Sequence, residues 1–305
     1  MNWREWVRAG AWVLAVALWS MLASADPLRC EPLDSAAPPA VPAAHARGLA
    51  WRVRAPNGAQ STLFGTMHSG DPRVLAERAR IAPAFAAADT FVLEVALDGD
   101  ALGELGQAMF YAGSESLADA VDGALFAATL RLLSMHGIDA AAAARMKPWA
   151  ALTALSVPPA GPAPPLDLVL LADARAAGKR VLGLESVAEH IAVFEQFSVA
   201  VQGDMLREIV CHYAVMQREV DAMIEVYAAH DLAALFARGL RHAGSDRQAF
   251  IDALLWQRNA RMFERLLPVL ESGRAFIAVG ALHLPGERGL LGLLAQRGYA
   301  LEALY

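Results

Sequence analysis

Short uninterrupted runs of apolar residues alternate along most of the chain with longer stretches in which apolar positions recur at helical spacing. Apolar runs of this length predict strands buried on both faces, because apolar and polar residues would alternate in a strand with one solvent-exposed face. The pattern predicts an α/β fold, with α+β as the alternative, built on a central mixed sheet flanked by helices. The predicted strands are 49–55, 61–66, 90–95, 180–185, 274–279 and 299–304.

The middle of the chain is predicted to be mostly helical. The composition does not shift strongly and no charge run interrupts the chain, so we expect one domain over 49–305 with a helical insertion, preceded by a flexible lead-in over 26–48. The proline-rich stretch 158–165 predicts a rigid loop between two helices. The predicted helices are 73–88, 117–136, 148–157, 166–178, 198–241 and 246–270.

The motif Gly-x-x-His occurs twice, each time directly after a predicted strand. The first copy runs from Gly65 to His68 and the second from Gly280 to His283. Glycine permits a backbone turn that bulkier residues resist, so each strand end can present an imidazole at the sheet's edge. A single histidine at a strand end is more often structural. Two copies in similar surroundings indicate either an internal duplication or two halves of one site, and they favour a functional over a structural role.

Two further predicted strands carry a carboxylate near their end. Glu94 lies inside an apolar run, where an unpaired buried charge would cost several kcal/mol, so it requires a cation, a metal or strong donors nearby. A structural ion pair is the alternative for Glu94. Glu185 is a weaker candidate, because the residue after it, Ser186, can simply cap the next helix.

Arg258 falls on the apolar face of the predicted helix 246–270, with Asn259 beside it. Such an arginine either extends its charged end to solvent or reaches toward Glu94 or an anionic transition state, and Asn259 could orient a ligand or a water. Periodicity alone leaves these alternatives open.

Together these residues have the chemistry of a metal-dependent hydrolase. His68, His283 and Glu94 are suitable ligands for Mn²⁺, Co²⁺ or Zn²⁺, with Glu94 alternatively a general base and Arg258, Asn259 and Glu185 as further catalytic candidates. The sequence contains no HExxH motif, nucleophile elbow, phosphate loop or dinucleotide fingerprint, which disfavours serine hydrolases and nucleotide enzymes.

The N-terminus predicts export. Arg4 and Arg8 precede or flank an apolar stretch, and Ala23-Ser24-Ala25 fits a signal-peptidase site, so residues 1–25 are expected to be a cleaved signal peptide. An uncleaved anchor is the alternative, but the apolar stretch is short for a membrane span. We therefore expect a mature chain without a stable membrane span, periplasmic in a Gram-negative organism.

The net charge and the cysteine content limit the classes of partner and of metal site that this chain can have. The formal net charge is −6 and no basic patch emerges, so nucleic acid is a poor partner and a peptide or protein substrate fits better. Only two cysteines occur, Cys30 and Cys211, which excludes a cysteine-rich metal site. A disulfide between them and two free thiols both remain open, as does the oligomeric state.

The order of these motifs resembles the TraB/PrgY/GumN family, which includes the Tiki proteins. The resemblance implies a metal-dependent hydrolase fold related to erythromycin-esterase-like proteins, with His68, Glu94 and His283 at the site and Arg258, Asn259 and Glu185 in support. Tiki members are described as divalent-metal peptidases, whereas some bacterial members have no agreed reaction. The matching segments are Leu63–Pro72, Thr90–Val95, Met146–Trp149, Leu166–Leu168, Gly178–Ser186, Arg258–Asn259 and Phe276–Glu287.

Three functions follow as hypotheses. The first is an exported metallohydrolase, acting as a peptidase on peptide or protein segments. The second is a protein that binds or sequesters a peptide or small ligand without turning it over, with Glu94 and Arg258 recognising the ligand's charged ends. The third is a metal-free, esterase-like hydrolase with His68 as base.

Overall fold

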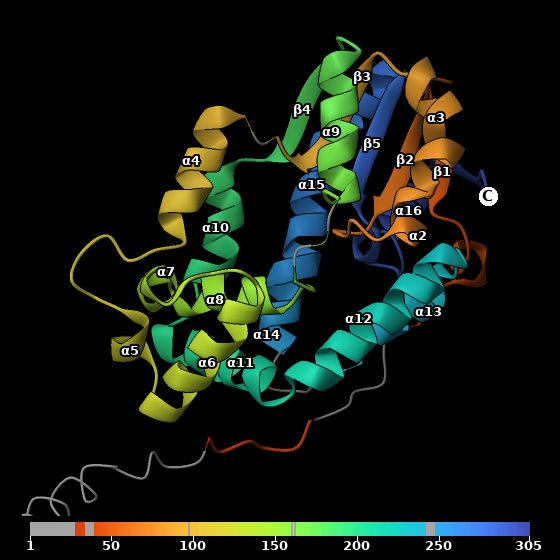
Figure 1. Cartoon of the computed structure of the whole chain (residues 1–305). Helices are drawn as coiled ribbons and strands as arrows, with labels where there is room; N and C mark the ends of the chain where they lie inside the picture. Colours follow the sequence, from red (N-terminus) through yellow and green to blue (C-terminus); the bar gives the residue numbers. More distant parts are fainter. Residues whose placement is uncertain (1–27, 34–39, 97, 160, 162, 242–247) are drawn as a thin grey trace, which may run out of the picture.

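A six-stranded mixed sheet lies at one end of the molecule in the computed structural model (Figure 1). The structure describes residues 28–33, 40–96, 98–159, 161, 163–241 and 248–305, so the predicted signal peptide lies outside the described residues. The strand order is β4-β3-β5-β2-β1-β6, which confirms the predicted α/β fold and the six predicted strands. Their bounds are β1 Ala50–Arg54, β2 Gln60–Thr66, β3 Thr90–Val95, β4 Arg180–Glu185, β5 Ala275–Gly280 and β6 Ala300–Ala303.

Four neighbouring strands of this sheet, β4, β3, β5 and β2, run parallel to one another. β1 pairs antiparallel with β2 and with β6. The expectation of burial on both faces holds for the central strand β5, where only Gly280 is not fully buried. It is wrong for the edge strands β4 and β6, because each has one neighbour and leaves backbone and side chains at the rim of the sheet.

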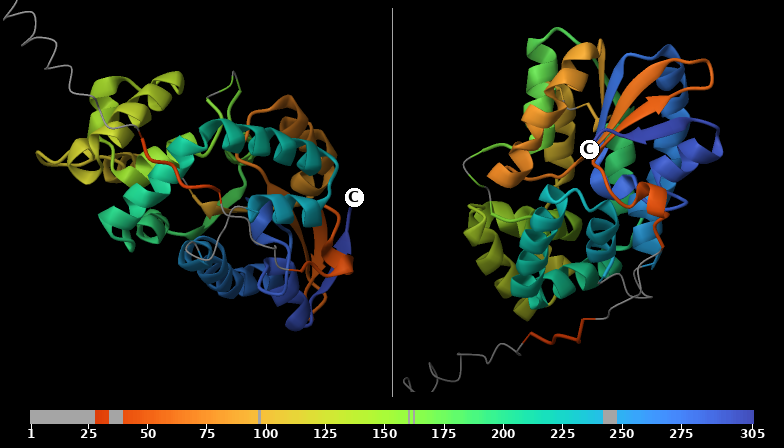
Figure 2. Two further views of the ribbon diagram at one scale, coloured as in Figure 1. Left: turned by 90° about the horizontal axis from the view of Figure 1, so that it is seen from below. Right: turned by 90° about the vertical axis from the view of Figure 1, so that its right-hand side faces the viewer.

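Helices cover both faces of the sheet. α3 (Glu77–Ala87) and α9 (Leu166–Ala176) lie on one face, and α15 (Arg258–Ser272) and α16 (Leu290–Gln296) lie on the other (Figure 2, right). Three phenylalanine rings fill the layer beneath α3: Phe85 contacts Phe91 and Phe276 at centroid distances of 5.7 and 5.3 Å. Burial of this apolar layer fixes the sheet and thereby the strand ends that carry the polar residues.

A second hydrophobic core belongs to a group of helices that we call the helical cluster. Its centre includes Trp149 and Phe194, whose rings stack at 5.1 Å. The carboxyl ends of the parallel strands face this cluster (Figure 1). The helical cluster consists of α4 (Gly99–Ala108), α5 (Leu117–Ala120), α6 (Gly123–Met135), α7 (Ala140–Arg145), α8 (Pro148–Leu155), α10 (Val187–Glu195) and α11 (Val199–Cys211).

Several predicted helices are divided in the structure. The segment 73–88 forms α2 (Pro72–Leu75) and α3, and 198–241 forms α11, α12 (Tyr213–Ala228) and α13 (Leu232–Gly239). The segment 117–136 forms α5 and α6, because Val121 is extended before Asp122 caps α6. α4, α7 and α16 were not predicted. In α4 the three glycines among ten residues weaken the helical pattern.

The last long helix contains a π-helical stretch. After α14 (Gln248–Ile251) comes η3 (Asp252–Gln257), and α15 begins at Arg258. Such stretches occur often at functional sites, because the extra residue per turn shifts the side chains that follow. Here the first residue after the π-helical stretch is Arg258. The predicted start of this helix at Asp246 lies outside the described residues.

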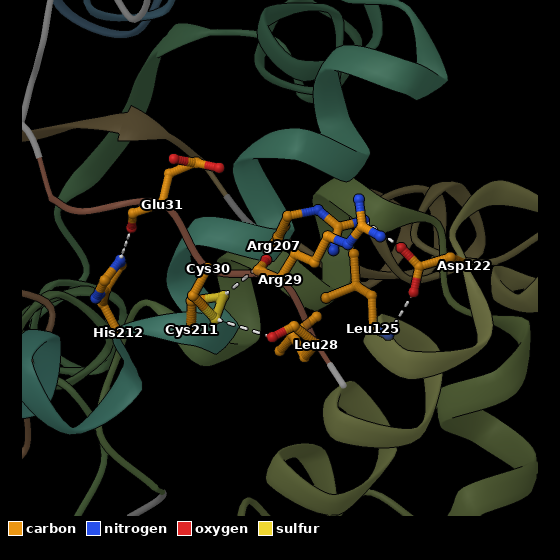
Figure 3. Close-up of a disulfide and its surroundings, with 9 residues drawn as sticks. All are labelled: Leu28, Arg29, Cys30, Glu31, Asp122, Leu125, Arg207, Cys211 and His212. Carbon is orange, nitrogen blue, oxygen red and sulfur yellow. Dashed lines mark hydrogen bonds and ion pairs between the residues drawn. A yellow bond between two sulfur atoms is a disulfide. The ribbon is translucent and has the colours of Figure 1, made fainter. Parts of the chain in front are cut away.

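The two cysteines form a disulfide that ties the segment around Cys30 to the end of α11 (Figure 3). His212, next to Cys211, holds the same segment through its Nε2, 2.8 Å from the carbonyl oxygen of Glu31. The question of pairing, open in the sequence, is thereby answered. Within the described ranges, no helix is long and apolar enough to cross a membrane.

Candidate functional site

The four parallel strands bring the four predicted polar residues to one edge of the sheet. Because the strands neighbour one another in the order β4, β3, β5, β2, their residues follow in the order Glu185, Glu94, His283, His68. The two Gly-x-x-His motifs start side by side, since Thr66 pairs with Gly280 in the β2–β5 register. The predicted convergence of the two motifs, separated by most of the chain, is thus present.

Both motif glycines are required by space and not by backbone conformation. Gly280 has an ordinary φ of −54°, and Gly65 is not among the residues with positive φ. A Cβ on Gly65 would lie 2.8 Å from the side chain of Leu284, and one on Gly280 would lie 3.1 Å from Oε1 of Glu94. The expectation that these glycines supply a special turn is therefore wrong: they let the second motif and Glu94 approach the backbone.

Arg258 is the centre of the polar network and is buried. Its Nε donates to Oε2 of Glu185 (2.8 Å), and its Nη2 donates to Oε2 of Glu94 (2.5 Å) and lies 2.7 Å from Glu185. Its Nη1 lies 3.3 Å from the carbonyl of Leu254 and 3.2 Å from Nε2 of His283. A guanidinium has five N–H groups, and here each has an acceptor. Arg258 therefore reaches Glu94, one of its two predicted roles, and has no donor left for a ligand.

Glu94 is an anchored carboxylate. Its Oε1 accepts a hydrogen bond from the backbone N–H of Gly280 at 2.6 Å. Burial would raise the pKa of Glu94, but His283, Arg258 and this N–H hold it well below its usual range. Because His283 is itself uncharged, the guanidinium of Arg258 supplies most of the electrostatic effect. Glu94 is thus ionised at neutral pH and is a poor proton acceptor there.

Glu185 is a structural partner of the same arginine, and its side chain is fully buried. Its Oε1 has no hydrogen-bond partner, with Nε of Arg261 at 3.6 Å. The alternative role suggested for this segment is also present, because Ser186 and Glu189 form a capping box at the start of α10. The two readings apply to different residues: Ser186 caps the helix while Glu185 neutralises Arg258.

Asn259 fixes the tautomer of His283. Its amide nitrogen donates to the carbonyl of Arg288 at 2.9 Å, so its Oδ1 faces Nδ1 of His283 at 2.6 Å and must accept the proton there. Nε2 of His283 then carries the lone pair. Burial lowers the pKa of His283 to about 4, which keeps the ring neutral. Asn259 thus orients a side chain of the site, where a ligand or water was expected.

His68 has the opposite environment. Its Nδ1 lies 2.8 Å from Oδ2 of Asp167, and the hydroxyl of Thr66 donates to the other oxygen of that carboxylate. The charge of Asp167 raises the pKa of His68 to about 9. The His68 side chain is 62 % exposed, so water screens part of this attraction. No sequence pattern predicted a role for Asp167, although it lies inside the segment Leu166–Leu168 that resembles the family.

A cavity of about 300 Å³ opens between these groups. Its polar wall contains His68, Glu94, Asp167 and His190. His190, on α10, was missed by sequence reasoning because nothing local marks it. Burial lowers its pKa to about 4, and its Nδ1 is buried without a hydrogen-bond partner. The rest of the wall is apolar and consists of Leu93, Val95, Leu105, Pro165, Leu168, Val187 and Ala278.

Larger hollows elsewhere lack this chemistry. One of about 770 Å³ lies over α4 and β4, and one of about 480 Å³ lies between α3 and α9. Neither is lined by His68 or Glu94, which both line the smaller cavity. We therefore assign the site to the smaller cavity, where titratable groups with shifted pKa values and an apolar wall occur together.

The donor chemistry fits a divalent metal at one side of this cavity. Nε2 of His283 is unprotonated and lies 3.7 Å from Oε1 of Glu94, a separation that two ligands at about 2.1 Å from one ion can span. Each motif histidine has its Nδ1 held by an oxygen acceptor, the arrangement that usually directs Nε2 to a metal. Among the described residues, no three His, Cys, Asp or Glu side chains are already grouped as ligands.

The comparisons with known proteins identify the family of this chain. No curated protein and no solved structure matches the chain. The model of the TraB/PrgY/gumN family matches residues 49–303, a span that begins just before β1, ends with β6 and includes all four of the aligned polar residues. With this match over most of its length, the chain belongs to the TraB/PrgY/gumN family.

Proposed function

We propose that this protein is an exported metal-dependent hydrolase that cleaves a peptide or protein segment in the cavity at the carboxyl ends of β3 and β5. One observation carries the proposal: Asn259 holds Nδ1 of His283, so the lone pair of that ring lies on Nε2, 3.7 Å from the ionised Glu94. His283 and Glu94 would hold the ion, and Nε2 of His283 would give up its contact with Nη1 of Arg258 to do so. His68, the third expected ligand, is held by Asp167 in a form that favours the proton, so we assign it to proton transfer instead. A bound Mn²⁺, Co²⁺ or Zn²⁺ supplies a Lewis acid and an activated water.

The side chains around these ligands have separable tasks. Arg258 keeps Glu94 ionised and oriented, and Asn259 keeps the lone pair of His283 on Nε2. We therefore assign both as positioning residues. Glu185 accepts hydrogen bonds from the other side of the guanidinium and so orients Arg258 toward Glu94. His68, at the exposed side, is the group best placed to move a proton to or from a substrate.

The two alternative functions have less support. A base acting without metal needs a free lone pair at neutral pH, whereas Asp167 favours the protonated form of His68. Capture of a ligand's charged end by Arg258 needs a paired set of free donors, and its Nε and Nη2 are already held by Glu185 and Glu94. Both alternatives nevertheless predict distinct experimental outcomes.

The decisive experiment measures bound metal in protein purified without chelators, in the wild type and in His283→Ala. We expect near-stoichiometric metal in the wild type, its loss in His283→Ala, and cleavage of a peptide library that a chelator abolishes. His212→Ala is the matched control. The ring of His212 is hydrogen-bonded to the carbonyl oxygen of Glu31, away from the cavity. It should keep both metal and activity.

Other outcomes contradict the proposal in different ways. Protein that takes up no Mn²⁺, Co²⁺ or Zn²⁺ but cleaves peptides would make the hydrolase metal-free. Peptide recovered unchanged after long incubation, yet bound, would make the cavity a capture site.

A further inference from the structure

The cavity beside the polar network has an apolar wall that the proposed chemistry does not use. Seven apolar side chains from β3, β5, α4, α10 and the start of α9 surround it. Leu93, Val187 and Ala278 are buried and form its floor, whereas Leu168, at its rim, is 43 % exposed. An apolar rim held in water next to a reactive group is typical of a surface that contacts an apolar ligand.

The charges of the wall are already neutralised by partners. Glu94 is paired with Arg258, and Asp167 is hydrogen-bonded to His68 and Thr66. An incoming carboxylate would meet Glu94 and Asp167, find no free donor of Arg258, and have to compete with Asp167 for the charge of His68. An incoming ammonium would lose its water without gaining a free carboxylate. Only an uncharged group avoids both costs.

The volume limits the size of the occupant. At about 300 Å³ the cavity is at the small end of ligand sites, which span about 300–1,000 Å³. It has room for one side chain or a short acyl group, and the remainder of a longer substrate must lie outside it. The open side is bordered by His68, so the occupant lies next to the proposed point of cleavage.

We propose that this cavity is a specificity pocket that selects substrates with one uncharged apolar side chain, of about the size of leucine, adjacent to the cleaved bond. The inference rests on the proposed hydrolase function for its catalytic consequence, but the binding preference of the pocket can be measured separately. Leu168 and Leu105 are the residues that determine this preference, because they form the outer part of the wall.

The test compares Leu168→Lys with Leu102→Lys. Leu102 is also an exposed leucine, 54 % accessible on α4, but it does not line the cavity. Metal-loaded wild type is given a peptide library with every residue type at each position, and cleavage sites are read by mass spectrometry. We expect one position next to the cleaved bond to favour leucine over aspartate by about tenfold or more. Leu168→Lys should remove most of this preference, and Leu102→Lys should retain it.

A second readout keeps the pocket testable without turnover. N-acetyl-leucinamide should shift the ring resonances of His68 in an NMR titration, whereas N-acetyl-aspartic acid amide should not. Cleavage without an apolar preference at any position, or equal behaviour of the two lysine variants, overturns the pocket while leaving the hydrolase intact. Absence of cleavage together with selective binding of the leucine compound overturns the hydrolase and supports the pocket.

Discussion

The two Gly-x-x-His motifs occupy equivalent places on neighbouring parallel strands, yet their histidines have opposite properties. His283 is only 5 % exposed, and its Nδ1 faces an amide oxygen, whereas His68 is 62 % exposed and faces a carboxylate. The pKa of the first is lowered to about 4 and that of the second is raised to about 9. The motif therefore determines where an imidazole lies, whereas burial keeps His283 neutral and the carboxylate of Asp167 favours the charged form of His68.

The same contrast extends to the cations nearby. Arg258 contacts Nε2 of His283 directly, so a second positive charge on that ring would be unfavourable. His68 has Asp167 as its direct partner instead. One motif thus supplies a neutral donor of a lone pair and the other supplies a cation or a proton source, a division of roles common in acid–base sites.

Removing Arg258 should cause the largest loss of stability and make the environments of the two histidines more alike. In Arg258→Met, Glu94 and Glu185 lose their cation in a buried site, so we expect the free energy of unfolding to fall by about 3–5 kcal/mol in urea titrations. His283 would then face Glu94 without an intervening cation, and its pKa should rise, as that of His68 does.

Arg261→Met is the matched control for this change. Arg261 is half-buried and lies 3.6 Å from Glu185, so its loss should cost less than about 1 kcal/mol. Equal losses in the two variants would show that Arg258 does not organise the site.

Acid should separate the two motifs through stability. A buried histidine with a folded pKa of about 4 and an ordinary value of 6.5 binds fewer protons folded than unfolded, so stability falls as the pH drops from about 6.5 toward 4. Between pH 7 and 4.5 this group should contribute a loss of about 2 kcal/mol. The pH-dependent loss measured by chemical denaturation in metal-free protein should therefore be smaller by that amount in His283→Gln.

His68→Gln should act with the opposite sign and in another pH range. Because its folded pKa is raised, His68 contributes stability below about pH 6.5 that is lost as the pH rises through about 9. Its exposure makes this contribution smaller than that of His283. An identical pH profile for the two variants would contradict the assigned environments.

Replacing Asp167, the partner of His68, should have the smallest effect of these substitutions, because it changes only the pKa of one exposed histidine. Asp167→Asn removes the charge that raises the pKa of His68, which should fall by about one unit, equivalent to about 1.4 kcal/mol, in an NMR titration of its ring protons. Asp173→Asn, on the same helix but paired with Arg78, should leave it unchanged. A pKa that does not move in Asp167→Asn would mean that solvent screens the pair completely.

Local patterns were sufficient for the strands and for the four residues at their ends. The segments that form β3 and β5 are apolar because both strands are buried at the centre of the sheet. An uninterrupted apolar run of this kind can be recognised in the sequence alone. Glu94 stood out for the same reason, as a charge inside such a run. The divided helices were harder, because caps such as Asp122 interrupt a periodicity that otherwise continues.

The partners of those residues could not be read from local patterns. Asp167 lies in the first turn of a helix, where acidic residues are common, and its contact with His68 depends on how α9 packs against the sheet. His190 likewise reaches the cavity only through the position of α10. Contacts of this kind depend on tertiary packing, which no local pattern in a single sequence reveals.

The position of β5 makes the sheet and the candidate site depend on a segment late in the described chain. β5 is nearly the last strand in sequence, yet it lies between β3 and β2, and its end leads into His283. A chain that stops before Ala275 leaves β2 and β3 with unpaired facing edges, which are prone to pair with other chains. It also lacks one of the two imidazoles. Synthesis must therefore pass His283 before the candidate site can assemble, and products truncated before Ala275 are expected to lack the site and to be aggregation-prone.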